Sequence, residues 1–263
     1  RSENKCHIAK NCYFIYECIT AYIQFWFCQY NKEKRTLMYN FFTVTILRFV
    51  SIYFVISVFV AAYFYPGGNI HDPLQVGYSF SHNFLSDLGG YASRAGDVNF
   101  LSAFFFNFSM FIFAAVGIGF LFVPWLFKDD KVNFYFALLG SLFFFAGTIH
   151  FAGVGLTPHD LYLYEHIYFA KTAFRILIPA GFFYIIVFFR SSVPNFYAYM
   201  TLIFFLFTTG YVIYQLTNGS PRDSMDALIE QVTIQKVISF ISVINIFGLS
   251  FGFKARIKEL NIN

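Results

Sequence analysis

The stretch "NFLSAFFFNFSMFIFAAVGIGFLFVP", residues 99–124, contains no Asp, Glu, Lys or Arg. At a rise of about 1.5 Å per residue, a helix of this length crosses the roughly 30 Å hydrocarbon core of a bilayer. Backbone amides have no water partner there, so the stretch must be a helix or part of a closed β-barrel. Barrel strands have about ten residues of alternating polarity, whereas this stretch is apolar on every face. It therefore predicts a transmembrane helix.

Runs of the same kind recur along the 263-residue chain, which is 58% hydrophobic and 12% charged. A soluble domain carries about 25% charged residues, so most of this surface does not face water. We predict an all-α, polytopic membrane protein, a six-transmembrane-helix bundle. Its net charge of +4 comes without a basic run suited to nucleic acid, so no nucleic-acid partner is expected. The spans are predicted at about 41–65, 99–124, 133–155, 167–189, 195–217 and 232–253.

The first 37 residues differ from the rest. The first methionine is Met38, and no cysteine follows it. We interpret residues 1–37 as a non-native or disordered N-terminal extension and residues 38–263 as the six-helix transmembrane domain. An additional helix over residues 12–30 is the alternative. The four cysteines fit no Cys-x-x-Cys metal pattern; they are Cys6, Cys12, Cys18 and Cys28.

Basic residues accumulate in alternate connections between the predicted spans. The connections at 66–98, 156–166 and 218–231 contain only Arg94 and Arg222. Positive residues are retained on the cytoplasmic side during insertion, so both termini are expected to be cytoplasmic. The basic set on that side consists of Lys32, Lys34, Arg35, Lys128, Lys131, Arg190, Lys254, Arg256 and Lys258.

The stretch "SHNFLSDLGGYASRAGDVNFLS", residues 81–102, is unusually polar and lies on the predicted outer side. If residues 78–88 are helical, they form a short amphipathic helix suited to the outer interface. Gly89-Gly90 is expected to end it through a left-handed conformation, and Asp97 to cap the next helix. The polar face would hold Ser79, His82, Asn83, Ser86 and Asp87, and the apolar face Phe80, Phe84, Leu85 and Leu88.

A second polar cluster, "HFAGVGLTPHDLYLYEH", spans residues 150–166. Gly153, Gly155 and Pro158 predict a turn between the third and fourth spans. Asp160 and Glu165 then lie near a helix N-terminus, where the helix dipole favours negative charge.

Four cations fall inside predicted spans, of which Arg48, near the inner end of the first, can extend to the cytoplasmic interface. Lys171 and Arg175 are one turn apart in the fourth, and Lys236 lies in the sixth. A charge at the bilayer centre costs about 2.5–3.5 kcal/mol on insertion scales, so such side chains usually face the bundle and are paired. One interpretation is internal ion pairs, Arg175 with Asp87 and Lys236 with Glu230. The other is a cationic pocket, open to the outer leaflet, for a phosphate or carboxylate headgroup.

The segments "FLSDLGG", "NFLSAFFFNFSMFIFA" and "GVGLTPHDLYLYEHIYFA" resemble a family of bacterial and archaeal membrane proteins, domain-of-unknown-function family 998. More distantly, they resemble the FRAG/DRAM/Sfk group. The resemblance implies about six helices, a Ser-Asp-x-Gly motif before the second and a Pro-x-Asp…His motif at the fourth. These are Ser86–Gly89 and Pro158–Asp160 with His166. It further implies a prokaryotic plasma membrane and, through the second group, an association with membrane lipid.

The leading hypothesis is a lipid-associated membrane protein with an outer-leaflet polar pocket for an anionic headgroup. Membrane lipid is the expected partner, and no cofactor is required. Lys171 and Arg175 would neutralise the headgroup, and the side chains that orient it would be Asp87, His82 and His166. The candidate ligand-binding residues are His82, Ser86, Asp87, Arg94, Asp160, His166, Lys171 and Arg175.

Two alternatives stay open. A metal-dependent intramembrane hydrolase would bind zinc through three or four ligands and activate a water; alkaline ceramidases use a His-x-x-x-His pair on one helix, which this sequence lacks. A small-solute or proton-coupled transporter would use titratable groups within the helices, but no inverted repeat is evident. The candidate zinc ligands are His82, Asp87, His150, His159 and His166.

Overall fold

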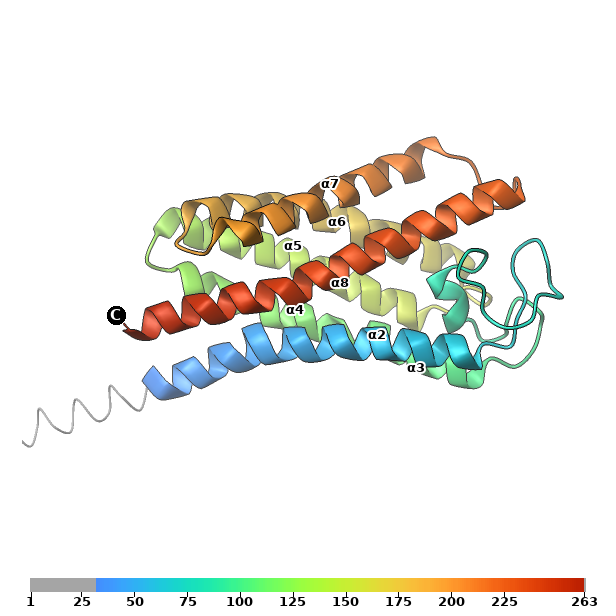
Figure 1. Ribbon diagram of the computed structural model, residues 1–263, viewed down its shortest axis with the longest axis horizontal. Helices are drawn as coiled ribbons and strands as arrows, with labels where there is room; N and C mark the ends of the chain where they lie inside the picture. The colour runs from blue at the N-terminus through green and yellow to red at the C-terminus, as the bar shows by residue number, and fades with distance from the viewer. Residues whose placement is uncertain (1–31, 263) are drawn as a thin grey trace, which may run out of the picture.

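The computed structural model describes residues 32–262 and contains six helices that are long and apolar enough to cross a membrane (Figure 1). This confirms the predicted six-helix membrane bundle. Residues 32–37 are helical and continue into the first span. The rest of the predicted extension, and the alternative helix at 12–30, lie outside the described residues. The spans are Lys32–Phe64, Phe100–Phe127, Lys131–Leu156, Leu163–Arg190, Asn195–Thr217 and Met225–Leu260.

Two of the spans are interrupted. The first contains a π-helical turn, η1 (Phe41–Thr45), before α2 (Ile46–Phe64). The second is divided into α3 (Phe100–Ile112), α4 (Ala114–Phe120) and the 3-10 helix η3 (Val123–Phe127). The remaining spans are α5 (Lys131–Leu156), α6 (Leu163–Arg190), α7 (Asn195–Thr217) and α8 (Met225–Ile262).

The turn predicted at Gly153 and Gly155 is wrong, because α5 continues through both to Leu156. These glycines allow close helix packing instead. A Cβ on Gly153 would lie 2.6 Å from the ring of Phe169, and one on Gly155 would lie 2.6 Å from the carbonyl oxygen of Asn107. The turn therefore begins only after Leu156.

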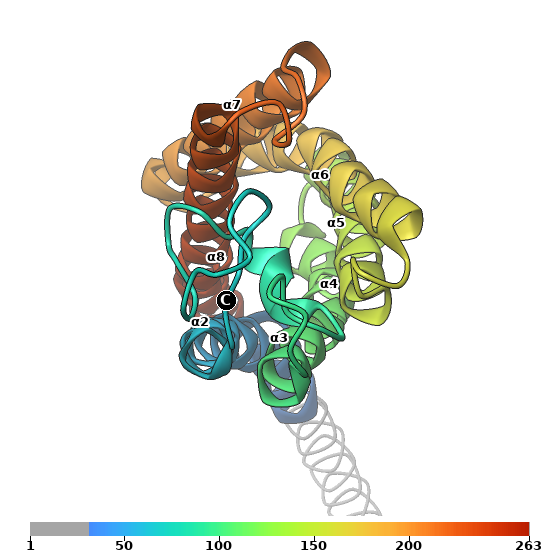
Figure 2. The same ribbon diagram turned by 90° about the vertical axis from the view of Figure 1, so that its right-hand side faces the viewer.

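The helices form a closed ring, seen end-on in Figure 2. Around it, α2 contacts α3, α3 contacts α5, and α5, α6, α7 and α8 follow in order until α8 returns to α2. Aromatic side chains from several helices pack together inside part of the ring. Phe120 stacks on Phe144 at 3.8 Å between ring centroids and meets Tyr184 and Phe253 edge-on. We call this packed group the aromatic plug.

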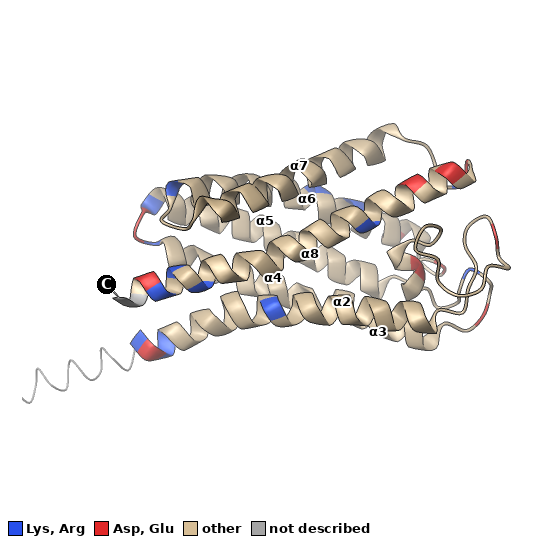
Figure 3. Cartoon of the chain, in the orientation of Figure 1, with Lys and Arg blue, Asp and Glu red and all other residues tan. Residues whose placement is uncertain are grey.

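Both ends of the described chain lie at the same end of the ring, where Lys and Arg gather (Figures 1 and 3). We call it the basic end and the opposite one, which carries residues 65–99, the loop end. At the basic end Arg256 is 5% exposed and donates to the Leu126 carbonyl and to Asp129, at 3.0 and 2.6 Å. Arg190 pairs with Asp130 at 3.2 Å. Arg256 and Arg190 thus link two helices to the connection that precedes α5.

The helix predicted over residues 78–88 is wrong in extent. Only the 3-10 helix η2 (Leu85–Gly89) forms, and the preceding residues are turns and extended chain. The side chain of Asn83 replaces helical hydrogen bonds: its Oδ1 accepts from the backbone of Ser79 at 2.9 Å, and its Nδ2 donates to the carbonyl of Gly68 at 2.7 Å. Asn83 and Asp87 therefore face the protein interior, not an aqueous interface.

The expected ends of this segment also differ. Gly89 and Gly90 both lack a positive φ angle. They allow close approach instead, because a Cβ on Gly89 would clash with Asn107 and Phe106, and one on Gly90 with His159. Asp97 does not cap α3, which begins after Asn99. The Asn99 side chain instead donates to the carbonyls of Leu88 and Gly90, at 3.0 and 2.9 Å.

Gly117 in α4 provides a test of the packing. A Cβ there would clash with Thr148 and approach Phe145 of α5. We expect Gly117→Ala to reduce the free energy of unfolding by about 1–3 kcal/mol, the usual range for overpacking. The control is Gly210→Ala in α7, where a Cβ meets nothing within 4 Å and the gain in helix propensity is up to about 1 kcal/mol. Equal melting temperatures of the two variants in detergent would contradict this packing.

Candidate functional site

The centre of the loop end is the buried carboxylate of Asp87, only 1% exposed. Its Oδ1 accepts from Arg94 Nη2 at 2.8 Å and Nε at 3.0 Å. Its Oδ2 accepts from the backbone N–H of Phe84 at 2.9 Å and from Asn83 Nδ2 at 3.3 Å. A buried charge needs a partner and hydrogen bonds of this kind. The suggested ion pair between Asp87 and Arg175 is wrong, because Arg94 is the partner.

The second sequence cluster packs directly against the first. Asp160 accepts hydrogen bonds from the backbone N–H groups of Tyr91 and Ala92, both at 2.8 Å. His159, 4% exposed, places its Nε2 3.8 Å from Asp87 Oδ1. Its ring meets that of His166 edge-on, with centroids 6.1 Å apart. Asp160 thus holds the 91–92 segment of the loop, a role different from the helix-dipole role expected for it.

Burial and charge act together on His159. Burial and the nearby Arg94 guanidinium lower the pKa of its imidazole from 6.5 to about 4, although Asp87 and Asp160 oppose the change. Arg94 neutralises much of the Asp87 charge, so burial dominates and the ring is neutral at pH 7. For Asp160, burial raises the carboxyl pKa, but hydrogen bonds from Ala92 and Tyr91 outweigh it and hold the pKa below its usual value.

His166 has a defined tautomer in its neutral form. Its Nδ1 lies 2.7 Å from the carbonyl oxygen of Thr157. A carbonyl can only accept, so Nδ1 carries the proton and Nε2 carries the lone pair. The Nε2 atom is then a hydrogen-bond acceptor on a ring that borders two cavities.

The larger cavity has a volume of about 700 Å³ and opens at the loop end between η2, α6, α7 and α8. Three cations border it: Arg94 from the loop, Lys171 from α6 and Arg222 from the α7–α8 connection. Among the described residues that line it, none is Asp or Glu. The uncharged polar side chains of its wall are Ser86, His159, His166, Tyr211, Tyr214, Gln215, Asn218, Ser220, Gln231 and Gln235. We call it the cationic cavity.

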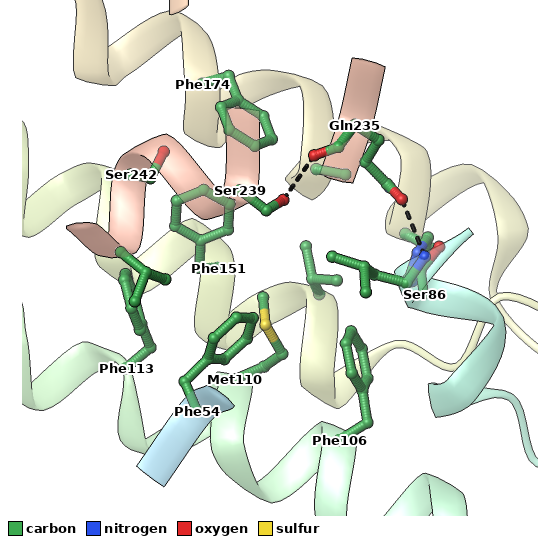
Figure 4. A pocket seen from close by; sticks show the side chains of 15 residues that line it. Phe54, Ser86, Phe106, Met110, Phe113, Phe151, Phe174, Gln235, Ser239 and Ser242 are labelled. Atoms are coloured by element: carbon green, nitrogen blue, oxygen red, sulfur yellow. Dashed lines mark hydrogen bonds between the residues drawn. The ribbon is translucent and has the colours of Figure 1, made fainter. Parts of the chain in front are cut away.

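A second, narrower cavity of about 70 Å³ lies deeper in the ring and is shown in Figure 4. We call it the apolar slot. Side chains from α2, α3, α5, α6 and α8 surround it, and Ser86, His166, Ala170 and Gln235 border it and the cationic cavity alike. Its wall is mostly apolar and includes Phe54, Phe106, Met110, Phe113, Phe151, Val154 and Phe174.

The structure brings together only part of the predicted site. Ser86, Arg94, His166 and Lys171 line the cationic cavity, and Asp87 and Asp160 hold its walls from behind. His82 and Arg175 line neither cavity. The ring of His82 bonds to the hydroxyls of Ser79 and Ser81, while Arg175 is exposed on α6 and makes no hydrogen bond or ion pair within the described residues.

The predicted zinc ligands do not converge. His82 stays within its own turn, and His150 lies in α5, where its Nδ1 bonds to the carbonyl of Ala146 at 2.8 Å. Over residues 32–262, no group of three or more His, Cys, Asp or Glu side chains is arranged to hold a metal. Asp87, His159 and His166 are neighbours, with Asp87 already paired to Arg94.

Several residues of the site were not predicted from the sequence. Arg222 and Gln235 line the cationic cavity, and Gln235 Oε1 accepts from the backbone N–H of Leu85 at 2.9 Å, joining α8 to η2. The expected pair between Lys236 and Glu230 is wrong: Lys236 is 6% exposed and donates to the carbonyl of Asn83. In the sequence, the adjacent polar residues Gln235 and Lys236 interrupt an apolar run, and this interruption could have indicated that this part of α8 faces the site.

Comparison with protein-family models, curated proteins and solved structures finds no match to this chain. The family resemblance of the two polar motifs therefore stays a prediction. Function must be inferred from the two cavities and their walls.

The state of His159 makes stability depend on pH. Its pKa is about 4 when folded and 6.5 when unfolded, so the unfolded chain binds the proton more strongly between these values. The contribution of His159 to the free energy of unfolding should be constant above pH 6.5. It should fall as the pH drops toward 4, by at most about 3 kcal/mol. We expect His159→Gln to weaken this dependence, measured as melting temperature in detergent at pH 7 and 4.5. The matched control His82→Gln should melt like the unsubstituted protein, and the same pH dependence in all three proteins would contradict the assignment.

Proposed function

We propose that this integral membrane protein binds an anionic membrane amphiphile, with the charged headgroup in the cationic cavity. One observation carries the proposal: Lys171 and Arg222 border the cavity, and neither forms an ion pair within the described residues. The charge of Arg94 is balanced by Asp87. Two positive charges that border the same cavity thus favour a phosphate or carboxylate as their partner.

The depth of the cavity supports a ligand that resides in the membrane. Lys171 lies about two turns, roughly 12 Å, along α6 from its first residue, Leu163. Phosphate groups of membrane lipids occupy the interfacial layer outside the hydrocarbon core. A cation at this depth, on a cavity that opens at the ends of the spans, suits a headgroup and not a fully buried solute.

The aromatic plug favours binding over transport. The cationic cavity lies at the loop end, and Phe120, Phe144, Tyr184 and Phe253 pack together in the half of the ring toward the basic end. A secondary transporter needs a site that opens alternately to each side. A dense plug under a site open at one end is better suited to holding a ligand.

The orientation that we propose follows from charge. Lys and Arg gather at the basic end (Figure 3), and positive residues are retained in the cytoplasm during insertion. Both termini would then be cytoplasmic and the cationic cavity would face the outer leaflet. The family resemblance favours the plasma membrane of a prokaryote.

Exchange of Lys171 tests the headgroup site. The probe is butyl phosphate, titrated by calorimetry into the protein in nanodiscs of zwitterionic lipid. We expect Lys171→Gln to weaken binding about tenfold or more, since a hydrogen bond to a charged group is worth about 1.5–3 kcal/mol. Arg175→Gln is the matched control, one turn along the same helix but outside the cavity, and it should bind like the unsubstituted protein. Undetectable binding, or equal loss in both variants, would overturn the proposal.

Accessibility labelling tests the orientation. Ala95→Cys lies in an exposed part of the loop end and Lys258→Cys is exposed at the basic end; each is made in a chain whose four cysteines are replaced by serine. An impermeant maleimide added to intact cells should label position 95 and should reach position 258 only after permeabilisation. The opposite pattern would invert the orientation.

A further inference from the structure

The cationic cavity and the apolar slot are joined. Ser86, His166, Ala170 and Gln235 form part of both walls, so a single ligand can reach from one space into the other. Polarity changes sharply at this junction. Cations border the outer space, while phenylalanine rings of α2, α3, α5 and α6 surround the inner one (Figure 4).

Away from its junction with the cationic cavity, the slot offers water few hydrogen-bonding partners. The hydroxyls at its α8 wall are already used within the helix: Ser239 donates to the Gln235 carbonyl at 2.8 Å and Ser242 to the Ile238 carbonyl at 2.7 Å. The Oε1 of Gln235 accepts from Leu85. A buried water needs about two to four free polar partners, and cavities with apolar walls stay dry. The slot therefore favours an apolar occupant.

Its size limits that occupant. A volume of about 70 Å³ is roughly half that of an engineered apolar cavity of about 150 Å³ that binds benzene, so it admits only a few methylene groups. Rigid rings form its wall, among them Phe151 of α5 and Phe174 of α6, which pack against each other edge-on at 5.1 Å between centroids. Two parallel chains or a fused ring system would not fit in this volume without repacking of these rings.

We propose that the apolar slot is a tail-binding site, which receives one narrow alkyl or acyl chain of the ligand whose anionic group occupies the cationic cavity. This inference rests on the proposed function and narrows the ligand to an anionic amphiphile with a single chain where it enters the protein. His166 lies at the joint between headgroup and chain. Its Nε2 lone pair accepts a hydrogen bond there, for example from the P–OH of a monoprotonated phosphate monoester.

A chain-length series tests the inference. Methyl, ethyl, propyl, butyl and hexyl phosphate are titrated separately into the protein in nanodiscs of zwitterionic lipid. Each methylene removed from water is expected to raise the affinity about fourfold, and the rise should stop once a few carbons fill the slot. An affinity independent of chain length overturns the tail site.

Ser242 provides the matched variants. Ser242→Leu places a larger apolar side chain at the slot without removing any interhelical hydrogen bond, because the hydroxyl bonds only within α8. It should abolish the dependence on chain length and leave methyl phosphate binding unchanged. Ser242→Ala leaves the slot open and should keep the dependence. A full dependence retained by a folded Ser242→Leu protein overturns the tail site, and Ser239→Leu serves as a second filling variant if the first does not fold.

The two proposals fail in different ways. If methyl phosphate binds, and binds more weakly to Lys171→Gln, but longer chains bind no better, the headgroup site stands and the tail site is overturned. If no member of the series binds, or if Lys171→Gln binds each of them as well as the unsubstituted protein, the headgroup site is overturned and the tail inference falls with it.

Discussion

The loop end depends on the ion pair between Asp87 and Arg94. The carboxylate is buried, and it is satisfied by one guanidinium, one amide side chain and one backbone N–H. Because Arg94 comes from the distal part of the loop and Asn83 from the proximal part, this single carboxylate fixes the segment at both sides of η2. Loss of one partner would leave an uncompensated buried charge, a defect of about 3–5 kcal/mol in other proteins.

From that pair the rest of the site follows by contact. Arg94, held by Asp87, borders the cationic cavity, and its charge contributes to keeping His159 neutral. Asp160 fastens the neighbouring residues Tyr91 and Ala92. The carboxylates thus hold the cavity wall in place from outside the cavity, while Lys171 and Arg222 border the cavity and have no acidic partner among residues 32–262. At the basic end two arginines do have acidic partners. Arg256 pairs with Asp129 and Glu259, and Arg190 pairs with Asp130. These two arginines of the basic end therefore stabilise the fold, whereas at the loop end Arg94 alone has such a role among the three cations that border the cavity in the described part of the chain.

The spans could be predicted because the solvent of a membrane helix leaves little choice: a long apolar run must be helical. The position of the site could also be predicted, since polar residues in an apolar chain mark it, and Ser86, Arg94, His166 and Lys171 do line the cavity. The errors concern the irregular backbone of residues 78–88 and the rotation of α6 about its own axis. A helical pattern over 78–88 placed His82 beside Asp87, but Asn83 substitutes for the helix with side-chain hydrogen bonds. Sequence alone could not tell which of Lys171 and Arg175 turns inward, because helix rotation is set by packing against neighbours.

The ring closes where α8 meets α2, so the last helix of the bundle lies against the first. Gln235 and Ser242 of α8 also form part of the inner walls, and Phe54 of α2 lies across from them. During synthesis the earlier helices are made before α8. Until α8 is made, it cannot cover the inward faces of those helices. The two cavities are therefore enclosed only once α8 has joined the bundle, because α8 supplies Gln235 to both walls and Ser242 to the wall of the apolar slot.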